Sequence, residues 1–376
     1  MSRAALRGAR RIVVKIGSSS LTDASGGGLD SGAVTAVADA VAGRFAAGTQ
    51  VVLVSSGAIA AGLAPLGLTT RPRDLATQQA AASVGQGLLV AHYTRAFAAH
   101  GLTVAQVLLT AEDVIRRAQY KNGQRALERL LALGMVPVIN ENDTVATDEI
   151  RFGDNDRLAA LVAHVVQADA LVLLTDVDAL YTGHPRLADS RRISVVAHPG
   201  ELDGVEVSQR GSGVGTGGMT TKVEAAMTAT GAGIPTLVAA ARDIAPALAG
   251  QDVGTWFEAT HARPRTRRLW LAHAASTRGS LMLDDGAVAA ITDGKRSLLA
   301  AGVVDVSGTF DPGDPVELLT PTGSVVARGL AGYGSEELPE RLGLSSGVLR
   351  ERFGADRPVV HRDDLVVLRP KVHRTR

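Results

Sequence analysis

Short apolar runs alternate with longer Ala-rich stretches over the first part of the chain. The runs are rich in β-branched residues and end in small or polar ones, at 11–16, 50–54, 103–109, 135–139, 170–174 and 235–239. The stretches between them have helical character and lie at 31–47, 73–100, 119–133, 156–166 and 221–230. Because continuous apolar strands that alternate with helices form parallel sheets covered on both faces, we expect an α/β domain with a mainly parallel sheet.

The pattern changes near residue 260. Residues 261–268 hold four Arg and a Pro and are typical of a linker. Short alternating runs with Asp-Gly turns follow, at 279–283, 287–291, 303–306, 315–319 and 324–330, which predicts a small all-β barrel or sandwich. We therefore expect a first domain, a linker, a second domain and a polar C-terminal tail, with bounds at 1–260, 261–275, 276–354 and 355–376.

Composition excludes several classes of function. The chain has no Cys, which removes disulfides, thiol nucleophiles and Cys-bound metals. Lys and Arg total 39 against 38 acidic residues, so no overall field favours nucleic acid or a membrane surface. The apolar stretch before Lys15 is too short for the core of a signal peptide, and no apolar run approaches a membrane span. We expect a soluble cytoplasmic protein.

Small and hydroxylic residues follow the first two runs, where parallel sheets bind their ligands. Lys15 lies just before the end of the first run and is followed by Gly17 and three Ser, an arrangement suited to a phosphate. Ser55, Ser56 and Gly57 follow the second run and offer hydroxyls and helix N-terminal amides to a carboxylate. Taken alone, each pattern is also that of an ordinary turn or helix cap.

Two dense polar clusters, NENDT and FGDND, follow the run at 135–139. An amino-acid substrate needs acceptors for its ammonium group, and Asp143 and Asn155 are candidates. Asp154 and Asp156 are candidates to orient lysines or Mg²⁺. A solvated loop is the alternative interpretation.

Two further segments suit a nucleotide. Thr175 and Asp176 follow a buried run and are placed to meet a base or ribose, although a capped turn has the same pattern. Residues 213–218 are Gly-rich and precede Lys222 on the first turn of a helix, which suits a triphosphate. Their match to the dinucleotide-binding spacing is weak, and the chain has no GxxxxGK[ST] motif, so it is not a P-loop protein.

Taken together, these motifs resemble the amino acid kinase family. The segments that carry the resemblance occur in order along the chain: VVKIGSSSLT, VVLVSSGAIAAG, VPVINENDTVATDEIRFGDNDRLAALVA, LLTDVDALYT and GVGTGGMTTKVEAA. Residues from 276 to about 354 resemble the PUA domain that often follows such a kinase.

The resemblance implies an αβα sandwich followed by a PUA-like barrel. It implies that ATP, with Mg²⁺, phosphorylates the side-chain carboxylate of L-glutamate in the first step of proline biosynthesis. It also implies feedback inhibition by proline. We expect a homo-oligomer, a dimer or tetramer, and direct transfer of the product to the next enzyme is open.

The resemblance also assigns roles to individual residues. Lys15 and Lys222 would stabilise the transferring phosphoryl group, and Asp156 would orient them. Glutamate would be held by Ser56, Asp143 and Asn155, with Asp154 nearby. The ATP site would comprise Lys15, Thr175, Asp176, Thr216, Gly217, Gly218, Met219, Thr220, Thr221 and Lys222. No protein residue is assigned to a metal.

Two other interpretations remain at this point. The same fold could phosphorylate acetylglutamate, aspartate, carbamate or a nucleoside monophosphate, although the block from Asn140 to Asp156 favours free glutamate. Alternatively, the arginines at 263–268 and the barrel-like region suggest an RNA-binding protein. The near-neutral charge and the 3% aromatic content argue against RNA.

Overall fold

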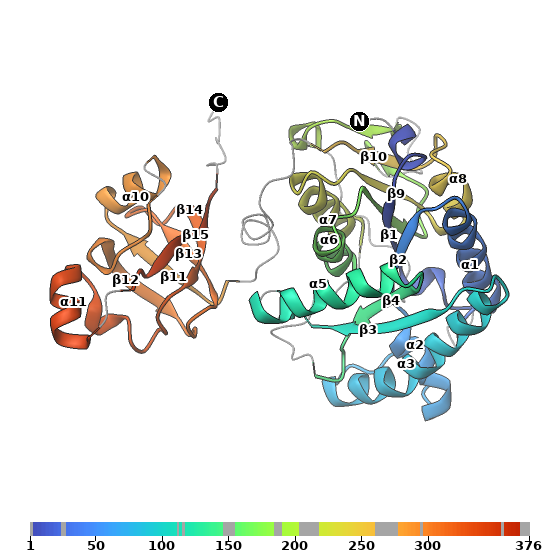
Figure 1. Ribbon diagram of the computed structural model, residues 1–376, viewed down its shortest axis with the longest axis horizontal. Helices are drawn as coiled ribbons and strands as arrows, with labels where there is room; N and C mark the ends of the chain where they lie inside the picture. The colour runs from blue at the N-terminus through green and yellow to red at the C-terminus, as the bar shows by residue number, and fades with distance from the viewer. Residues whose placement is uncertain are drawn as a thin grey trace. The chain divides into compact units, whose positions relative to one another are not determined.

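The computed structural model separates the chain into two compact units, Met1–Arg263 and Pro264–Arg376 (Figure 1). The described residues are 3–23, 28–110, 113–114, 117–145, 155–183, 190–202, 218–259, 277–293, 296–354 and 357–368.

The first unit is built on an eight-stranded sheet with the order β3-β4-β2-β1-β5-β9-β10-β8. Every neighbouring pair is parallel except β9 with β10, so the expected mainly parallel sheet is confirmed. The strands are β1 (Arg11–Ile16), β2 (Gln50–Ser55), β3 (Val104–Leu109), β4 (Val136–Glu141), β5 (Ala170–Thr175), β8 (Val195–Val196), β9 (Thr236–Ala240) and β10 (Thr255–Phe257). A separate pair joins β6 (Leu180–Tyr181) to β7 (Arg192–Ile193).

Helices cover both faces of this sheet. Helices α1, α3 and α8 share one core with it, whereas α5, α6 and α7 lie on the opposite side (Figure 1). The helices are α1 (Ser31–Ala46), α2 (Ala58–Leu63), α3 (Leu75–Ala98), α5 (Arg117–Ala132), α6 (Asn155–Val165), α7 (Met219–Gly231) and α8 (Ile244–Leu248). The 3-10 turns of this unit are η1 (Arg3–Leu6), η2 (Ser18–Ser20), η3 (Ala64–Leu66), η4 (Pro199–Leu202) and η5 (Ala241–Asp243).

The central strand β1 faces two different environments. Ile12, Val14 and Ile16 pack into the core shared with α1 and α3. Because successive side chains of a strand point to opposite faces, Val13 and Lys15 face the side covered by α6. The alternation thus directs the one lysine of this strand toward the start of α6.

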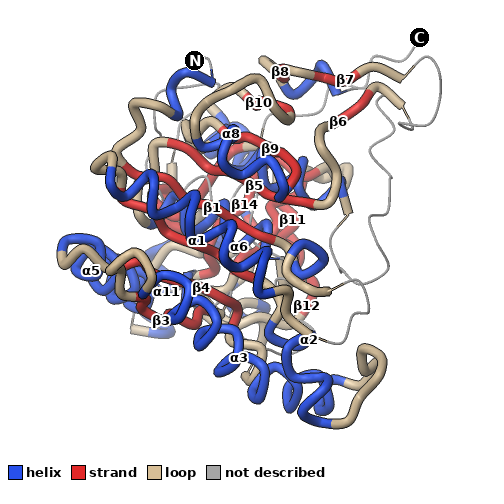
Figure 2. The backbone as a smooth tube through the Cα atoms, turned by 90° about the vertical axis from the view of Figure 1, so that its right-hand side faces the viewer, coloured by secondary structure: helices blue, strands red, loops and turns tan. Residues whose placement is uncertain are grey.

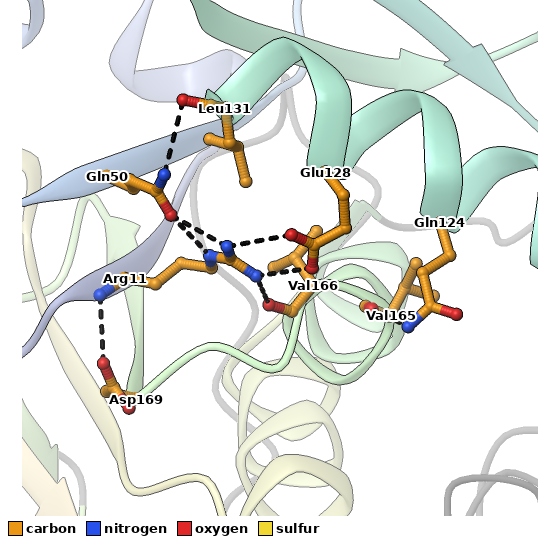
Figure 3. Close-up of polar contacts among 8 residues, drawn as sticks. All are labelled: Arg11, Gln50, Gln124, Glu128, Leu131, Val165, Val166 and Asp169. Carbon is orange, nitrogen blue, oxygen red and sulfur yellow. Dashed lines mark hydrogen bonds and ion pairs between the residues drawn. The ribbon is translucent and has the colours of Figure 1, made fainter. Parts of the chain in front are cut away.

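The amino end of β1 is fastened by a polar cluster (Figure 3). The Arg11 guanidinium donates to Gln50 Oε1 at 2.8 and 2.9 Å, to Glu128 Oε1 at 2.7 Å and to the Val166 carbonyl. The backbone N–H of Arg11 donates to Asp169 Oδ2 at 3.0 Å. One side chain therefore ties β1 to β2, to α5 and to the end of α6, and it fixes the register of the strand that carries Lys15.

Helices α2 and α3 lie side by side at one edge of the unit (Figures 1 and 2). Their backbones approach so closely that a Cβ atom at Gly85 would lie 1.8 Å from the Ala58 carbonyl oxygen. A Cβ atom at Gly62 would lie 1.9 Å from the Ala81 carbonyl oxygen. Only glycine fits at either position, and this contact sets how deeply α3 reaches beside the sheet.

The second unit contains a five-stranded sheet with the order β12-β11-β13-β14-β15. Its elements are β11 (Gly279–Leu283), α10 (Asp285–Thr292), η6 (Ala300–Gly302), β12 (Val303–Gly308), β13 (Pro315–Leu319), β14 (Val325–Ala331), η7 (Pro339–Arg341), α11 (Ser346–Phe353) and β15 (Val360–Val367). It has its own apolar core. The expected strand-rich second domain is therefore confirmed.

Two details of this unit differ from the sequence expectations. The run at 287–291, expected as a strand, lies inside helix α10 because Asp284 caps it by accepting a hydrogen bond from the Ala287 N–H at 2.6 Å. Strand β15 lies within the segment expected as a tail. It pairs with β14 because Val360 and Leu365 reach the core although charged residues separate them in sequence. Among the described residues, no helix combines the length and apolar character needed to cross a membrane.

We predict that Gly85→Ala destabilises the protein by about 1–3 kcal/mol, because the new methyl group must displace the backbone of α2. Gly87→Ala on the same helix is the control, since a Cβ atom there meets nothing within 4 Å. That variant should gain up to about 1 kcal/mol from helix propensity. Urea unfolding of both variants measures the difference, and equal stability would contradict the close approach.

Candidate active site

The carboxyl ends of β1, β2, β4 and β5 meet at one edge of the first sheet. In register, Ile16 of β1 stands opposite Ser55 of β2 and Leu174 of β5. The chain moves from β1 to β2 on one side and later returns to β5 on the other, so the strand order reverses beside β1. Ligands bind in the crevice that such a reversal opens at the carboxyl ends of the strands.

A buried carboxylate joins two lysines at this edge. Asp156 Oδ1 lies 2.5 Å from Lys15 Nζ, and Asp156 Oδ2 accepts a hydrogen bond from Lys222 Nζ at 3.1 Å. Thr221 Oγ1 donates to the same Oδ2 atom at 3.2 Å. Asp156 is 0% exposed, Lys15 2% and Lys222 5%. The cluster therefore brings together β1, the start of α6 and the start of α7.

The electrostatics of this cluster favour an anion. Its three charged side chains together carry one more positive than negative charge, and burial strengthens their mutual interactions. Asp156 lies in the first turn of α6 and Lys222 in the first turn of α7, so the N-terminal ends of two helices approach the same point. Helix N-termini carry partial positive charge and exposed N–H groups, which adds to the attraction for a phosphate.

A chain of buried amides runs beside the lysines. Asn155 Nδ2 donates to Ser56 Oγ at 2.9 Å, to the Ser55 carbonyl at 3.1 Å and to Asn140 Oδ1 at 2.8 Å. Asn140 Nδ2 donates in turn to Gln86 Oε1 at 2.8 Å. The amides connect the ends of β2 and β4 to α6 and α3.

The turn after β2 is shaped by a glycine and a tyrosine. Gly57 has a φ of 106°, a left-handed conformation that lets the chain pass from Ser56 directly into α2. Ser55 Oγ shares a hydrogen bond of 2.9 Å with Tyr93 Oη. Burial raises the pKa of the Tyr93 phenol, so it stays neutral and holds the serine in place.

Comparison with known proteins assigns the chain to a family. The family model described as "Amino acid kinase family" matches residues 10–240, and the PUA domain model matches residues 279–348. The chain is 60% identical to "Glutamate 5-kinase" of Thermobifida fusca over 98% of this chain and 96% of that protein. It is 58% identical to "Glutamate 5-kinase" of Streptomyces coelicolor over 98% and 99%.

The chain belongs to the amino acid kinase family and, within it, to the glutamate 5-kinases. A solved carbamate kinase from Giardia lamblia, bound to AMP-PNP, has the same fold with a TM-score of 0.51 and 18% identity. It covers 66% of this chain, and 98% of its own length is matched. The αβα architecture is thus that of an amino acid kinase.

Six of the residues expected in the site of this family member lie in two neighbouring clusters. The structure joins Lys15, Asp156, Lys222 and Thr221 in one cluster, and Asn155 with Ser56 in another. Both clusters start from α6, because Asn155 and Asp156 are adjacent.

The other predicted residues that the structure describes lie at the end of β5, at the start of α7 and in the turn after β4. Thr175 ends β5 and is buried, and its Oγ1 donates to Asp176 Oδ1 at 2.9 Å. Gly218 precedes α7, and its carbonyl accepts a bond from Thr221 Oγ1 at 2.9 Å. Met219 is buried and Thr220 is exposed at the start of this helix, and Asp143 is half-buried in the turn after β4. Asp154, Thr216 and Gly217 lie outside the described residues, as does the expected linker.

Sequence reasoning gave no role to three residues that hold these clusters in place. Gln86 and Tyr93 lie on α3, far in sequence from every motif, and Asn140 was noted within a polar cluster without a role. A glutamine beside a helical glycine carries no signal of its own. Gln78 on the same helix is also a glutamine, and its Nε2 donates to the backbone carbonyls of Pro72 at 3.0 Å and Arg73 at 3.3 Å, just before α3.

We predict that Asp156→Asn destabilises the protein by about 3–5 kcal/mol, because two buried ammonium groups then lose the carboxylate that they share. Asp39→Asn is the control. Its partner His100 lies 2.7 Å away in an exposed pair, so that change should cost under about 1 kcal/mol. Denaturant unfolding measures both values. A loss in Asp156→Asn no greater than in Asp39→Asn would show that the shared carboxylate contributes little.

Proposed function

We propose that this protein transfers the γ-phosphoryl group of ATP to the side-chain carboxylate of L-glutamate. The product is L-glutamyl 5-phosphate, and the reaction is the first step of proline biosynthesis. The observation that carries the proposal is the buried cluster in which Asp156 holds Lys15 and Lys222 at the sheet edge. Relatives named glutamate 5-kinase that align along nearly the whole chain support the choice of acceptor.

The reaction needs electrostatic help more than a general base. A glutamate carboxylate is already ionised at neutral pH, so it can attack phosphorus without losing a proton. The obstacle is repulsion between this anion and the triphosphate. Lys15 and Lys222 would neutralise the equatorial oxygens of the transferring group, and Asp156 would keep both ammonium groups aimed at it. The attacking and leaving oxygens would lie in line between them.

The acceptor amino acid would be held beside the lysines. Asn155 and Ser56 would contact glutamate, and Asp143 would accept a hydrogen bond from its ammonium group. Asp154 would lie nearby, adjacent to Asn155 in sequence. This arrangement explains why a free amino acid suits the site, since an acylated amine carries no ammonium to bind.

The nucleotide would occupy the side of β5 and α7. Thr175 and Asp176 would meet its base and ribose, and residues 216–222 would wrap its phosphates. Mg²⁺ would enter with the triphosphate, where it supplies charge neutralisation, and Asp156 would act on the lysines.

Regulation and assembly complete the proposal. We propose that the protein works in the cytoplasm as a homo-oligomer and that proline inhibits it. RNA binding by the second unit has less support, since the net charge of the chain is +1. A gel-shift titration of the whole protein with RNA at low salt would reveal such binding.

The decisive experiment traps the acyl phosphate. The purified protein is incubated with Mg·ATP, hydroxylamine and either glutamate, aspartate or acetylglutamate. We predict at least about tenfold more hydroxamate with glutamate than with either other acceptor. Acetylglutamate lacks the ammonium group, and the side chain of aspartate is shorter. Proline should suppress hydroxamate formation. Hydroxamate formed preferentially with another acceptor would show that this acceptor, and not glutamate, is the substrate. ADP release without any hydroxamate would contradict the proposed chemistry.

A further inference from the structure

The amides of Gln86, Asn140 and Asn155 form a directed series across three elements. Asn155 donates to Asn140, and Asn140 donates to Gln86, each at 2.8 Å. Their exposed fractions are 9%, 2% and 9%, so water has little access to any of them. Because each donor needs the oxygen of the next amide, the orientation of one amide constrains that of its neighbour.

Asn155 is the end of this series that lies in the proposed glutamate site. Its Nδ2 atom faces three acceptors, from Ser55, Ser56 and Asn140, so its Oδ1 atom points to the other side of the amide. This buried Oδ1 has no hydrogen-bond partner within the part of the chain that the structure describes. A buried acceptor without a donor is costly, and an ammonium group is the donor that an amino acid supplies.

Both ends of the Asn140 side-chain amide, the oxygen and the nitrogen, have hydrogen-bond partners. Its Oδ1 accepts the N–H of Glu141 at 2.9 Å as well as Asn155 Nδ2. Its Nδ2 has Gln86 Oε1 as acceptor. Without Gln86, this buried Nδ2 would have to turn toward another acceptor, and the oxygen that holds Asn155 would turn with it.

We propose that Gln86 is a positioning residue that determines specificity for substrates with a free α-ammonium group. It touches no reacting atom; it fixes Asn140, and Asn140 fixes the amide of Asn155 so that Oδ1 faces the ammonium. Gln86 stands at this position because Gly85 lets α3 approach α2 within backbone contact. The inference rests on the proposed function, since it concerns how glutamate is recognised.

The test compares glutamate with glutarate, which lacks the α-ammonium group. In Gln86→Met, the KM for glutamate should rise about threefold to tenfold, the value of one lost hydrogen bond. The inhibition constant of glutarate and the KM for ATP should stay as in the wild type. If the substitution disturbed the whole site, both of these constants would rise as well. Gln86→Leu provides the same test if the methionine variant does not fold.

Two controls sharpen this test. Gln86→Glu keeps an oxygen for Asn140 Nδ2, so its KM for glutamate should remain near the wild-type value. Gln78→Met makes the same exchange elsewhere on α3 and should change neither constant. If Gln86→Met weakens glutamate and glutarate equally, or neither, the inference is overturned while glutamate kinase activity stands. A wild-type protein that yields no hydroxamate with glutamate overturns the proposed function and this inference together.

Discussion

The site depends on one buried carboxylate that must satisfy two lysines from different elements. Asp156 is fully buried. Its Oδ1 atom lies 2.5 Å from Lys15 Nζ, and its Oδ2 atom lies 3.1 Å from Lys222 Nζ. Neither lysine would be stable at such burial without an anionic partner, because the charged forms would be desolvated without compensation. The strand β1 and the helices α6 and α7 must therefore meet at this point. The same arrangement gathers two cationic groups at the sheet edge, as the proposed transfer of a phosphoryl group requires.

Two other parts of the first unit hold these elements in place: the polar cluster around Arg11 and the contact between α2 and α3. Arg11 fastens the amino end of β1 to β2, α5 and the end of α6, so Lys15 at the other end has little freedom to shift (Figure 3). On the far side of the site, Gly62 and Gly85 let α2 and α3 pack at backbone distance, which brings Gln86 next to Asn140. Rigid elements thus carry the charged cluster and the amide series to adjacent places. Two adjacent clusters, one charged and one made of amides, suit the proposed reaction between a triphosphate and an amino acid.

Sequence alone was informative where chemistry and periodicity agree. Lys15 and Lys222 were identifiable because a lysine inside an apolar strand, or just after a glycine loop, needs a partner. Six of the eight strands of the first sheet were identifiable as short apolar runs, whereas β8 and β10, with two and three residues, match none of the predicted runs. The run at 287–291 was assigned wrongly, since a short apolar run reads equally as a strand or a helix until its Asp cap is recognised. Gln86 and Tyr93 could not be found, because their roles come from contacts across the fold and not from local pattern.

The most direct test asks whether the lysines act on the transferring phosphoryl group. MgADP with aluminium fluoride and glutamate forms an analogue of the transition state of phosphoryl transfer. Its binding should weaken about 10²- to 10³-fold in Lys222→Ala. Binding of MgADP alone should change less than about threefold, and Lys121→Ala, an exposed lysine on α5, should change neither. Equal losses for the two complexes would contradict the account, because Lys222 would then serve only to bind nucleotide.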